Sequence, residues 1–282
     1  MLTVKSWGGR SIENPDYENT FLNTIEELNY LYQGFPLESE IWARDGHRRS
    51  PYRALILFGL SPRTKDRLLV EMCCSFFEEF PDLNGFLEAG PPQWESLQRI
   101  VRAGQFPFIE SAIEVLQKNS RKVPKDAPTL ARIKGVGAKV TECVIGYGWG
   151  QEALPVDANV CRVVSRLGGL RWDKSSSLPT HVREHLKGMF HRHRGPLADQ
   201  HISMIDIHEL LRLHGQVICT RTPRCWQCPL AHCGARQSPM TASTKPEVSS
   251  NLWDDWRRLL LDPTCGNIRG NQSVKPIMRR NV

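Results

Sequence analysis

The sequence has no apolar run long enough to cross a lipid bilayer, and its first residues, MLTVKSWGGRS, lack the apolar core of a secretory signal. We therefore expect no membrane partner and a cytoplasmic location. In a reducing compartment, disulfides are a poor explanation for the nine cysteines. Four of them, Cys73, Cys74, Cys143 and Cys161, lie in apolar helical patterns and are predicted to be buried small hydrophobic residues.

Strand-like alternation is also scarce, whereas helical periodicity runs through most of the chain. Between Thr64 and Phe80, and again between Ala198 and Leu213, apolar residues recur on one helical face. The sequence therefore predicts an all-α protein. Further helices are predicted at 18–33, 51–60, 93–102, 108–118, 127–133, 138–148, 158–168 and 179–192.

Neither sign of charge dominates strongly, but Lys and Arg outnumber Asp and Glu by 37 to 30, for a formal net charge of +7. A basic chain favours a polyanionic partner such as nucleic acid, although many basic proteins bind none. The 282 residues are enough for one large domain or two modest ones.

Four cysteines crowd into one short segment: Cys219, Cys225, Cys228 and Cys233. Four thiolates in one loop can bind a [4Fe–4S] cluster or a structural zinc ion. The spacing C-x5-C-x2-C-x4-C contains one CxxC pair, whereas zinc ribbons usually have two. The spacing alone leaves both metals open.

A Gly-x-Gly turn interrupts the helical spacing within 129–147, where IKGVGAKV contains Gly135, Val136 and Gly137. A helix, a short glycine turn and a second helix form a helix-hairpin-helix. Glycine lets a ligand approach the backbone closely, and the free amides that start the second helix favour an anion. The turn can therefore hold a DNA phosphate without reading a base. An ordinary glycine turn between packed helices is the alternative.

Lys139 begins the second helix, and Asp157 follows eighteen positions later. The helix carries the chain away by about 15 Å. The next eight residues can span about 26 Å, so the two side chains can meet. A lysine amine attacks only when neutral, and partial burial near a helix N-terminus disfavours the ammonium. An opposing carboxylate can accept its proton or stabilise positive charge on a sugar. A solvated lysine and a helix N-cap are the alternatives.

The segments IKGVGAK, PVDANVCRVVSRLG and SPYRALILFGLSPRTKD resemble motifs of the endonuclease III branch of the helix-hairpin-helix DNA glycosylases. That family shows LPGVG-x-K followed by VDTHV-x-R-V at the same separation. The similarity runs patchily from about Ser50 to Cys233. It implies a two-lobed all-α fold in which Lys139 is the Schiff-base nucleophile and Asp157 is the essential carboxylate.

The resemblance also implies a function, that of a bifunctional DNA glycosylase and AP lyase in base excision repair. Such an enzyme flips a modified base, expected here to be a pyrimidine, from duplex DNA. Its lysine displaces the base, and β-elimination nicks the strand. The expected partner is double-stranded DNA with a modified base or an abasic site, bound by a monomer. The protein would be nucleoid-associated if its source is a prokaryote.

The segment LHGQVICTRTPRCWQCPLAHC is similar to the iron–sulfur loop of the same family, which favours a [4Fe–4S] cluster over zinc. The family spacing is C-x6-C-x2-C-x5-C, so each outer gap is one residue shorter here. Arg221 and Arg224 on this loop would offer guanidinium groups to phosphates. A pair of solvated charges is the alternative.

Two departures from the family pattern bear on the substrate. Arg63 stands where the family usually has a glutamine that helps fill the gap left by a flipped base. We expect Arg63 to fill that gap or to bind phosphate. Asn159 replaces the histidine of VDTH, and KVTECV with VDANV is closer to the DEMETER-type 5-methylcytosine glycosylases, which carry VECV and VDTNV. A 5-substituted cytosine is therefore an alternative substrate.

The resemblance predicts how the chain is divided. Residues 47–151 would form a six-helix barrel lobe that includes the hairpin at 129–147. The second lobe would join 1–46 to 152–234 and carry the iron–sulfur loop. Residues 235–282 are predicted to be a linker and tail.

Two rival functions come from other features. The segment HVREH at 181–185 fits the H-x-x-E-H pattern of inverted zinc metalloproteases, although a basic helix explains it more simply. A non-catalytic DNA-binding module stapled by a metal is the other rival. Lys139 discriminates here, because a pure binder needs no amine at that position.

Overall fold

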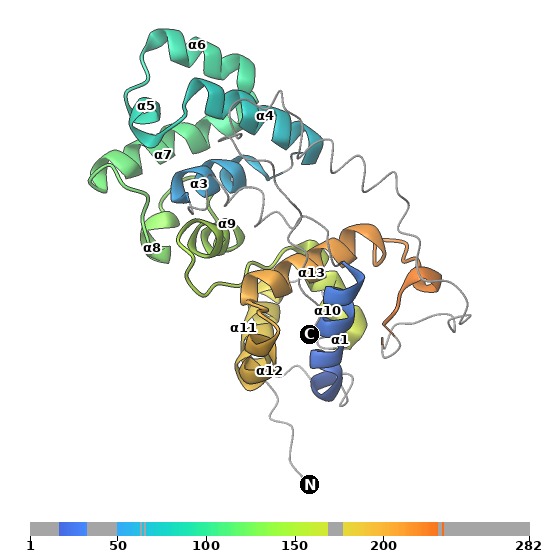
Figure 1. The fold of residues 1–282 in the computed structure, drawn as a ribbon. Helices are drawn as coiled ribbons and strands as arrows, with labels where there is room; N and C mark the ends of the chain where they lie inside the picture. The colour runs from blue at the N-terminus through green and yellow to red at the C-terminus, as the bar shows by residue number, and fades with distance from the viewer. Residues whose placement is uncertain are drawn as a thin grey trace, which may run out of the picture.

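The computed structural model describes residues 17–32, 50–62, 64, 66–168, 177–230 and 233. Every regular element in these ranges is helical and none is a strand, so the all-α prediction is confirmed (Figure 1). None of the described helices has the length and apolar character that a bilayer span requires. The elements are α1 (Tyr17–Leu31), α3 (Pro51–Leu60), α4 (Asp66–Glu79), α5 (Leu83–Leu87), α6 (Pro91–Ile100), η1 (Ala103–Gln105), α7 (Phe106–Lys118), α8 (Ala127–Leu130), α9 (Ala138–Cys143), η2 (Val144–Gly148), α10 (Ala158–Leu167), α11 (Leu178–Arg192), α12 (Arg194–Asp199), α13 (Met204–Val217) and η3 (Cys225–Gln227).

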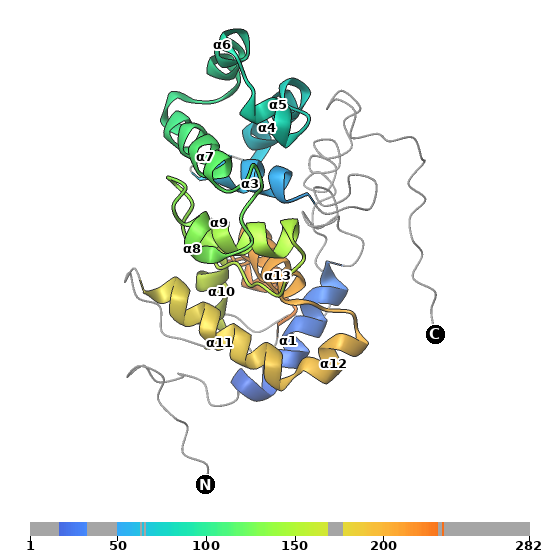
Figure 2. The ribbon, with the colours of Figure 1, turned by 90° about the vertical axis from the view of Figure 1, so that its left-hand side faces the viewer.

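The helices pack around two hydrophobic cores. The first, which we call the aromatic core, is built by α3 to η2, and its centre is a set of phenylalanine rings. The ring of Phe76 lies 5.1 Å from that of Phe80 and 5.5 Å from that of Phe86, centroid to centroid. The second, the aliphatic core, joins α1 to α10, α11 and α13, which are distant in sequence. Figures 1 and 2 show these two groups of helices one above the other.

Several helices begin where a side chain caps the first free amides. The Ser50 hydroxyl accepts from the Arg53 amide at 3.3 Å, and Pro51 occupies the first helical position. Asp82 caps α5 by accepting from the Gly85 amide at 2.9 Å. Such caps satisfy backbone donors that have no partner inside the helix. They explain why even a helix as short as α5 has a defined start.

The structure differs from the predicted helices in two places. The short helix α5 was not predicted, because its five residues are too few to show a period. The single helix predicted across 198–213 is two helices, α12 and α13. His201 between them adopts a left-handed φ of 57°, and Ser203 with Asp206 forms a capping box that starts α13.

The four scattered cysteines follow the expectation with one exception. Cys73, Cys143 and Cys161 are buried free thiols. Cys74 is only partly buried and is disulfide-bonded, so the prediction of a buried small hydrophobic residue is wrong there.

The second helix of the hairpin changes from α-helical to π-helical hydrogen bonding before it ends. The α-helix α9 passes directly into the π-helical turn η2, where the Trp149 amide donates to the Val144 carbonyl at 3.2 Å. Tyr147 of this turn belongs to the aromatic core, and its hydroxyl reaches Glu209 of α13. A Cβ atom on Gly146 would collide with the Ile205 side chain of α13. Residues 149–157, which we call the connector, then lead to α10. Segments of π-helix are rare and are frequently found near functional sites.

Candidate active site

The predicted hairpin is formed by α8, a tight turn and α9. Gly135 has a φ of 87°, a left-handed conformation that favours glycine. Val136 is buried and its amide donates to the Ile133 carbonyl at 3.0 Å, whereas Gly135 and Gly137 are exposed. The turn therefore fixes its middle residue in the core and leaves backbone on either side open to a ligand.

Lys139 and Asp157 lie at the starts of two helices, α9 and α10, that η2 and the connector separate along the chain. Lys139 is in the first turn of α9 and is partly buried. Asp157 caps α10, and its Oδ1 accepts from the amides of Asn159 at 2.8 Å and Val160 at 2.9 Å. Its Oδ2 accepts from the Asn159 side-chain amide at 3.2 Å. The capping alternative is therefore correct for Asp157, and it leaves the carboxylate oriented by three donors.

The electrostatic surroundings favour the ionised form of Asp157. Burial works against ionisation, but the pKa of the carboxyl still falls below its ordinary value of 3.8. The causes are the positive charges that His208, Lys139 and Arg212 can carry, together with the Val160 amide. Lys139 is thus close enough to Asp157 for its charge to act on the carboxylate.

His208 contributes to this site as a neutral imidazole. Burial lowers its pKa to about 3, because no water solvates the charged ring, and the charges of Arg212 and Lys139 act in the same direction. The ring also has a hydrogen-bonding interaction with the Pro155 carbonyl in the connector. Its Nδ1 has no hydrogen-bond partner among the residues that the structure describes. At neutral pH His208 is therefore uncharged, and Arg212 is a fixed positive charge near Asp157.

A buried ionic network lies behind these groups on α13. The Arg212 guanidinium donates to Glu209 Oε2 at 3.0 Å, and the Tyr147 hydroxyl of η2 donates to Glu209 Oε1. Glu209 is fully buried and Arg212 is 7% exposed. Sequence reasoning missed this network. Its signal is the spacing of Glu209, Arg212 and His208 by three and four residues on a helix that is otherwise apolar.

The four cysteines of the predicted metal loop line one pocket, together with Arg166 and His214. The Arg166 guanidinium donates to Cys219 Sγ at 3.3 Å and to the Thr220 carbonyl at 2.6 Å. Cys228 Sγ lies 3.6 Å from His214 Nε2. Burial raises the pKa of the Cys228 thiol to about 12, and the neighbouring thiols Cys233, Cys219 and Cys225 add to the effect.

The thiols that line this pocket could bind a cofactor at several separate atoms, but they do not surround a single metal ion. Within the described ranges, no three His, Cys, Asp or Glu side chains are placed so that they could hold one metal ion. The same holds for His181 and His185 of the H-x-x-E-H segment. Arg183 lies between those two histidines in the sequence, and its guanidinium lies 3.7 Å from the Glu142 carboxylate.

Helix α10 connects the cysteine pocket to Asp157. The Arg162 guanidinium donates through Nε to the Cys219 carbonyl at 2.9 Å. It also donates to Asn159 Oδ1 at 2.7 Å, and Asn159 in turn contacts Asp157. Asn159, which replaces the family histidine, is therefore a polar link between the carboxylate and the cysteine loop.

The remaining predicted residues are placed only in part. Arg221 and Arg224 are exposed on the cysteine loop, where the Arg221 carbonyl accepts from Arg166 at 3.0 Å. Their guanidinium groups are thus available to a ligand. Arg63 lies outside the described residues, so its predicted role stays a prediction.

Comparison with known proteins adds to this geometry. No family model matches the chain. Endonuclease III of Bacillus subtilis is 28% identical over 187 residues, which cover 64% of this chain and 79% of that protein. DEMETER-like protein 2 of Arabidopsis thaliana is 34% identical over 172 residues, covering 53% of this chain and 12% of that protein.

The fold is shared with a solved structure of a trapped endonuclease III–DNA covalent intermediate. The TM-score is 0.59 at 22% identity, with 77% of this chain and 96% of that chain covered. That likeness concerns the fold, and the sequence comparisons agree with it. By sequence the chain is similar to endonuclease III and, over part of its length, to DEMETER-like protein 2, and by fold it is similar to endonuclease III.

Proposed function

We propose that the protein is a bifunctional DNA glycosylase and AP lyase that removes a modified base from duplex DNA in base excision repair. The observation that carries the proposal is the placement of Lys139 at the start of α9, near enough to the partly buried, ionised Asp157 to help lower the pKa of its carboxyl. An amine beside a carboxylate at a helix-hairpin-helix is what covalent displacement of a base requires. A pure DNA-binding module has no use for that pair.

In the proposed reaction the target nucleotide is first flipped out of the duplex. The Lys139 nitrogen then forms a bond to C1′ of the sugar while the bond from C1′ to the base breaks, and its electron pair leaves with the base. Loss of a proton from nitrogen and opening of the sugar ring give a Schiff base. Removal of a C2′ proton then expels the 3′ phosphate, which nicks the strand.

Asp157 would support the first step in either of two ways. As a carboxylate it can accept the proton that the Lys139 nitrogen loses, or it can stabilise the positive charge that develops on the sugar. Its lowered pKa keeps it ionised at neutral pH. The three donors that cap α10 would hold its oxygens in a fixed direction.

DNA would be held through its phosphates. The exposed backbone of Gly135 and Gly137 on either side of buried Val136, and the exposed Arg221 and Arg224, are suited to that contact. We propose that a monomer binds one duplex. We also propose a barrel lobe at 47–151, a second lobe that joins 1–46 to 152–234, and a tail at 235–282. The two cores support this division for the described residues, and 235–282 lies outside them.

We propose a [4Fe–4S] cluster at Cys219, Cys225, Cys228 and Cys233. Zinc needs its ligands around one point, whereas each cysteine of a [4Fe–4S] cluster binds a separate iron. Four thiols that share one pocket, on a loop similar to the iron–sulfur loop of the family, favour the cluster. The cluster would be structural and would shape the loop that carries Arg221 and Arg224.

Elemental analysis of the purified full-length protein tests this cofactor. The cluster predicts about four irons and four sulfides per chain and a brown colour. A structural zinc predicts about one zinc and no colour. Cys228→Ser is expected to lose the iron, whereas Cys161→Ser, a buried cysteine outside the pocket, is expected to keep it.

Borohydride trapping tests the proposed activity. The full-length protein is incubated with borohydride and a duplex that contains one abasic site, and the covalent protein–DNA adduct is measured. Lys139→Ala is expected to lower adduct formation by at least about 10³-fold, because the nucleophile is removed. Lys118→Ala, an exposed lysine on α7, serves as the matched control. An adduct of undiminished yield from Lys139→Ala contradicts the proposal.

A second candidate concerns the base that is excised. Identity to DEMETER-like protein 2 is 34%, against 28% for endonuclease III, although over a smaller share of this chain. This favours 5-methylcytosine or another 5-substituted cytosine as an alternative to damaged pyrimidines. Single-turnover assays on a panel of duplexes, each with one modified base, separate the two. Excision of oxidised pyrimidines without 5-methylcytosine would remove the second candidate.

A further inference from the structure

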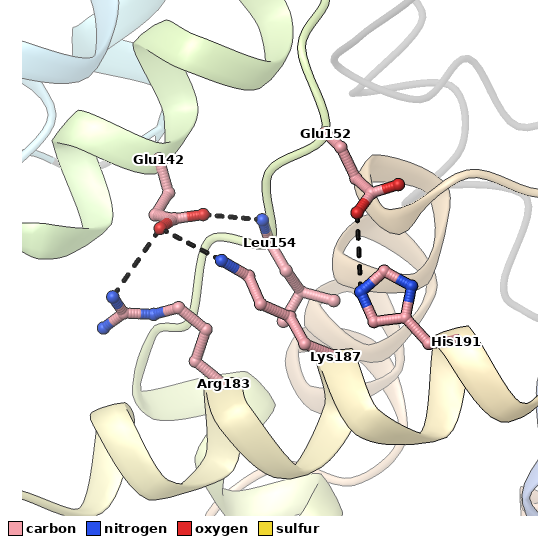
Figure 3. Close-up of polar contacts among 6 residues, drawn as sticks. All are labelled: Glu142, Glu152, Leu154, Arg183, Lys187 and His191. Atoms are coloured by element: carbon pink, nitrogen blue, oxygen red, sulfur yellow. Dashed lines mark hydrogen bonds and ion pairs between the residues drawn. The ribbon is translucent and has the colours of Figure 1, made fainter. Parts of the chain in front are cut away.

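Glu142 joins the helix that carries Lys139 to two other parts of the molecule. Its Oε2 accepts from the Leu154 amide of the connector at 2.8 Å. Its Oε1 lies 3.5 Å from Lys187 Nζ and 3.7 Å from an Arg183 guanidinium nitrogen, both on α11 (Figure 3). The side chains of Glu142 and Arg183 are only 15% and 14% exposed, so water screens this contact weakly.

Each of these contacts of Glu142 affects the distance between the side chains of Lys139 and Asp157. Glu142 follows Lys139 by three residues, so both side chains project from the same face of α9. Leu154 precedes Asp157 by three residues and is fully buried. The Glu142 carboxylate belongs to the helix of Lys139 and binds the backbone of the segment that leads to Asp157.

The neighbouring contact in Figure 3 provides a comparison. Glu152 lies 3.5 Å from His191 and 3.6 Å from Arg194, but the three side chains are 44%, 50% and 66% exposed. Exposed ion pairs contribute little, because solvent and salt screen them. The Glu152 contact joins the connector to α11 and α12 without being buried, so it is a suitable control for Glu142.

We propose that Glu142 is a positioning residue that sets the geometry between Lys139 and Asp157, an inference that rests on the proposed function. Helix α9 has six residues and continues into η2, and a helical segment this short depends on its tertiary contacts, which also determine how it is rotated. Rotation of α9 about its axis would swing Lys139 away from the sugar. The contacts of Glu142 with Leu154, Arg183 and Lys187 oppose that rotation.

Kinetics on the full-length protein test the inference. Glu142→Ala is expected to slow single-turnover trapping on abasic DNA by about 10- to 100-fold, as a displaced nucleophile does. The dissociation constant for the same duplex without borohydride is expected to stay unchanged. Glu142→Gln, which can still accept from the Leu154 amide, is expected to recover part of the rate, and Glu152→Gln is expected to match the wild type. An unchanged rate in Glu142→Ala, or a loss explained entirely by weaker binding, overturns the inference.

Hydrogen exchange of the protein without DNA gives a second readout that does not depend on activity. Loss of one hydrogen bond in Glu142→Ala is expected to speed exchange of the Leu154 amide by about 5- to 10-fold. If Glu142→Ala does not fold, Lys187→Met, which removes one partner, is expected to shift rate and exchange in the same direction by less. An unchanged Leu154 exchange overturns the inference. A wild-type protein that forms no adduct instead contradicts the proposed function, and the exchange result still decides whether Glu142 holds the connector.

Discussion

The two cores differ in what they bury. The aromatic core packs phenylalanine and tyrosine rings around Phe76, and the one polar residue buried in it within the described ranges is Thr141. The aliphatic core is lined by Leu, Val and Ile, yet α13 within it buries His208, Glu209, Arg212 and His214. In the part of the chain that the structure covers, all buried His, Glu and Arg side chains lie on this one helix.

The two cores therefore have different roles, since one supports the backbone of the hairpin and the other carries the buried charged groups near Asp157. Close-packed rings resist deformation and can hold the hairpin rigidly. Buried charges are costly and are weak evidence for stability, so their position on α13 beside Asp157 indicates an electrostatic role. The aromatic core would therefore hold the backbone of the hairpin, and α13 would set the charge environment of the carboxylate.

The largest effect expected from this comparison is on the rate, in variants of Asp157. Asp157→Asn keeps an oxygen that can cap α10 but removes the charge, so trapping on abasic DNA is expected to slow by about 10²- to 10⁴-fold. Asp157→Ala should lose a similar amount of activity. Its free energy of unfolding should also fall by about 1 kcal/mol, because the cap is lost. Trapping assays and urea unfolding measure the two effects. Equal stability of the two variants would show that the cap is not important.

The next effect is on stability, at the ion pair of α13. Arg212→Met removes the guanidinium beside fully buried Glu209 and is expected to lower the free energy of unfolding by about 3–5 kcal/mol. The double variant Arg212→Met with Glu209→Gln should recover part of the loss, because no buried carboxylate remains and an acceptor for Tyr147 is kept. Urea unfolding measures both. A double variant that is less stable than the single one contradicts the electrostatic interpretation.

The effect that is smallest at neutral pH comes from His208 and is a change in how stability depends on pH. The folded pKa of His208 is about 3, below its unfolded value of about 6.5, so the unfolded chain binds a proton that the folded chain does not. Stability is therefore lost as pH falls from about 6.5 toward 3, by up to about 1.4 kcal/mol per pH unit. His208→Gln should flatten this dependence in urea unfolding series.

Two features of the molecule serve as controls for that series. His214, whose pKa burial lowers to about 4, contributes in the same direction and remains in the variant. Asp157, with a pKa below 3.8, loses its contribution only at lower pH. Phe86→Leu in the aromatic core should lower stability equally at every pH. A pH dependence that His208→Gln leaves unchanged would falsify the assignment of a neutral buried imidazole.

Much of the fold could be predicted from periodicity and punctuation. Pro51 and Ser50 mark the start of α3, and its predicted range 51–60 agrees with the structure. The glycines of the hairpin mark the turn between α8 and α9, and Asp157 marks the start of α10. These signals are local, which is why the sequence carries them. The catalytic roles of Lys139 and Asp157 stay predictions.

The rest depends on contacts between distant residues. The apolar stripe of α13, with Ile207 and Leu211, predicts one buried face, but the structure buries the opposite face as well. Polar residues there look solvated in sequence, because periodicity does not show that α10 packs on this helix or that Tyr147 of η2 reaches Glu209. The π-helical turn at 144–148 has no local signature, because it differs from an α-helix by one residue in hydrogen-bond register.

The side chains that cross between the two cores limit how the protein can move. Tyr147 reaches Glu209 on one side, and Glu142 reaches α11 on the other, so a hinge opening would have to break both contacts together. A protein whose two cores are joined in this way would leave the bending to the DNA substrate. The cost of distorting the duplex would then help decide which sites are attacked, because weakly stacked or mispaired nucleotides deform most easily.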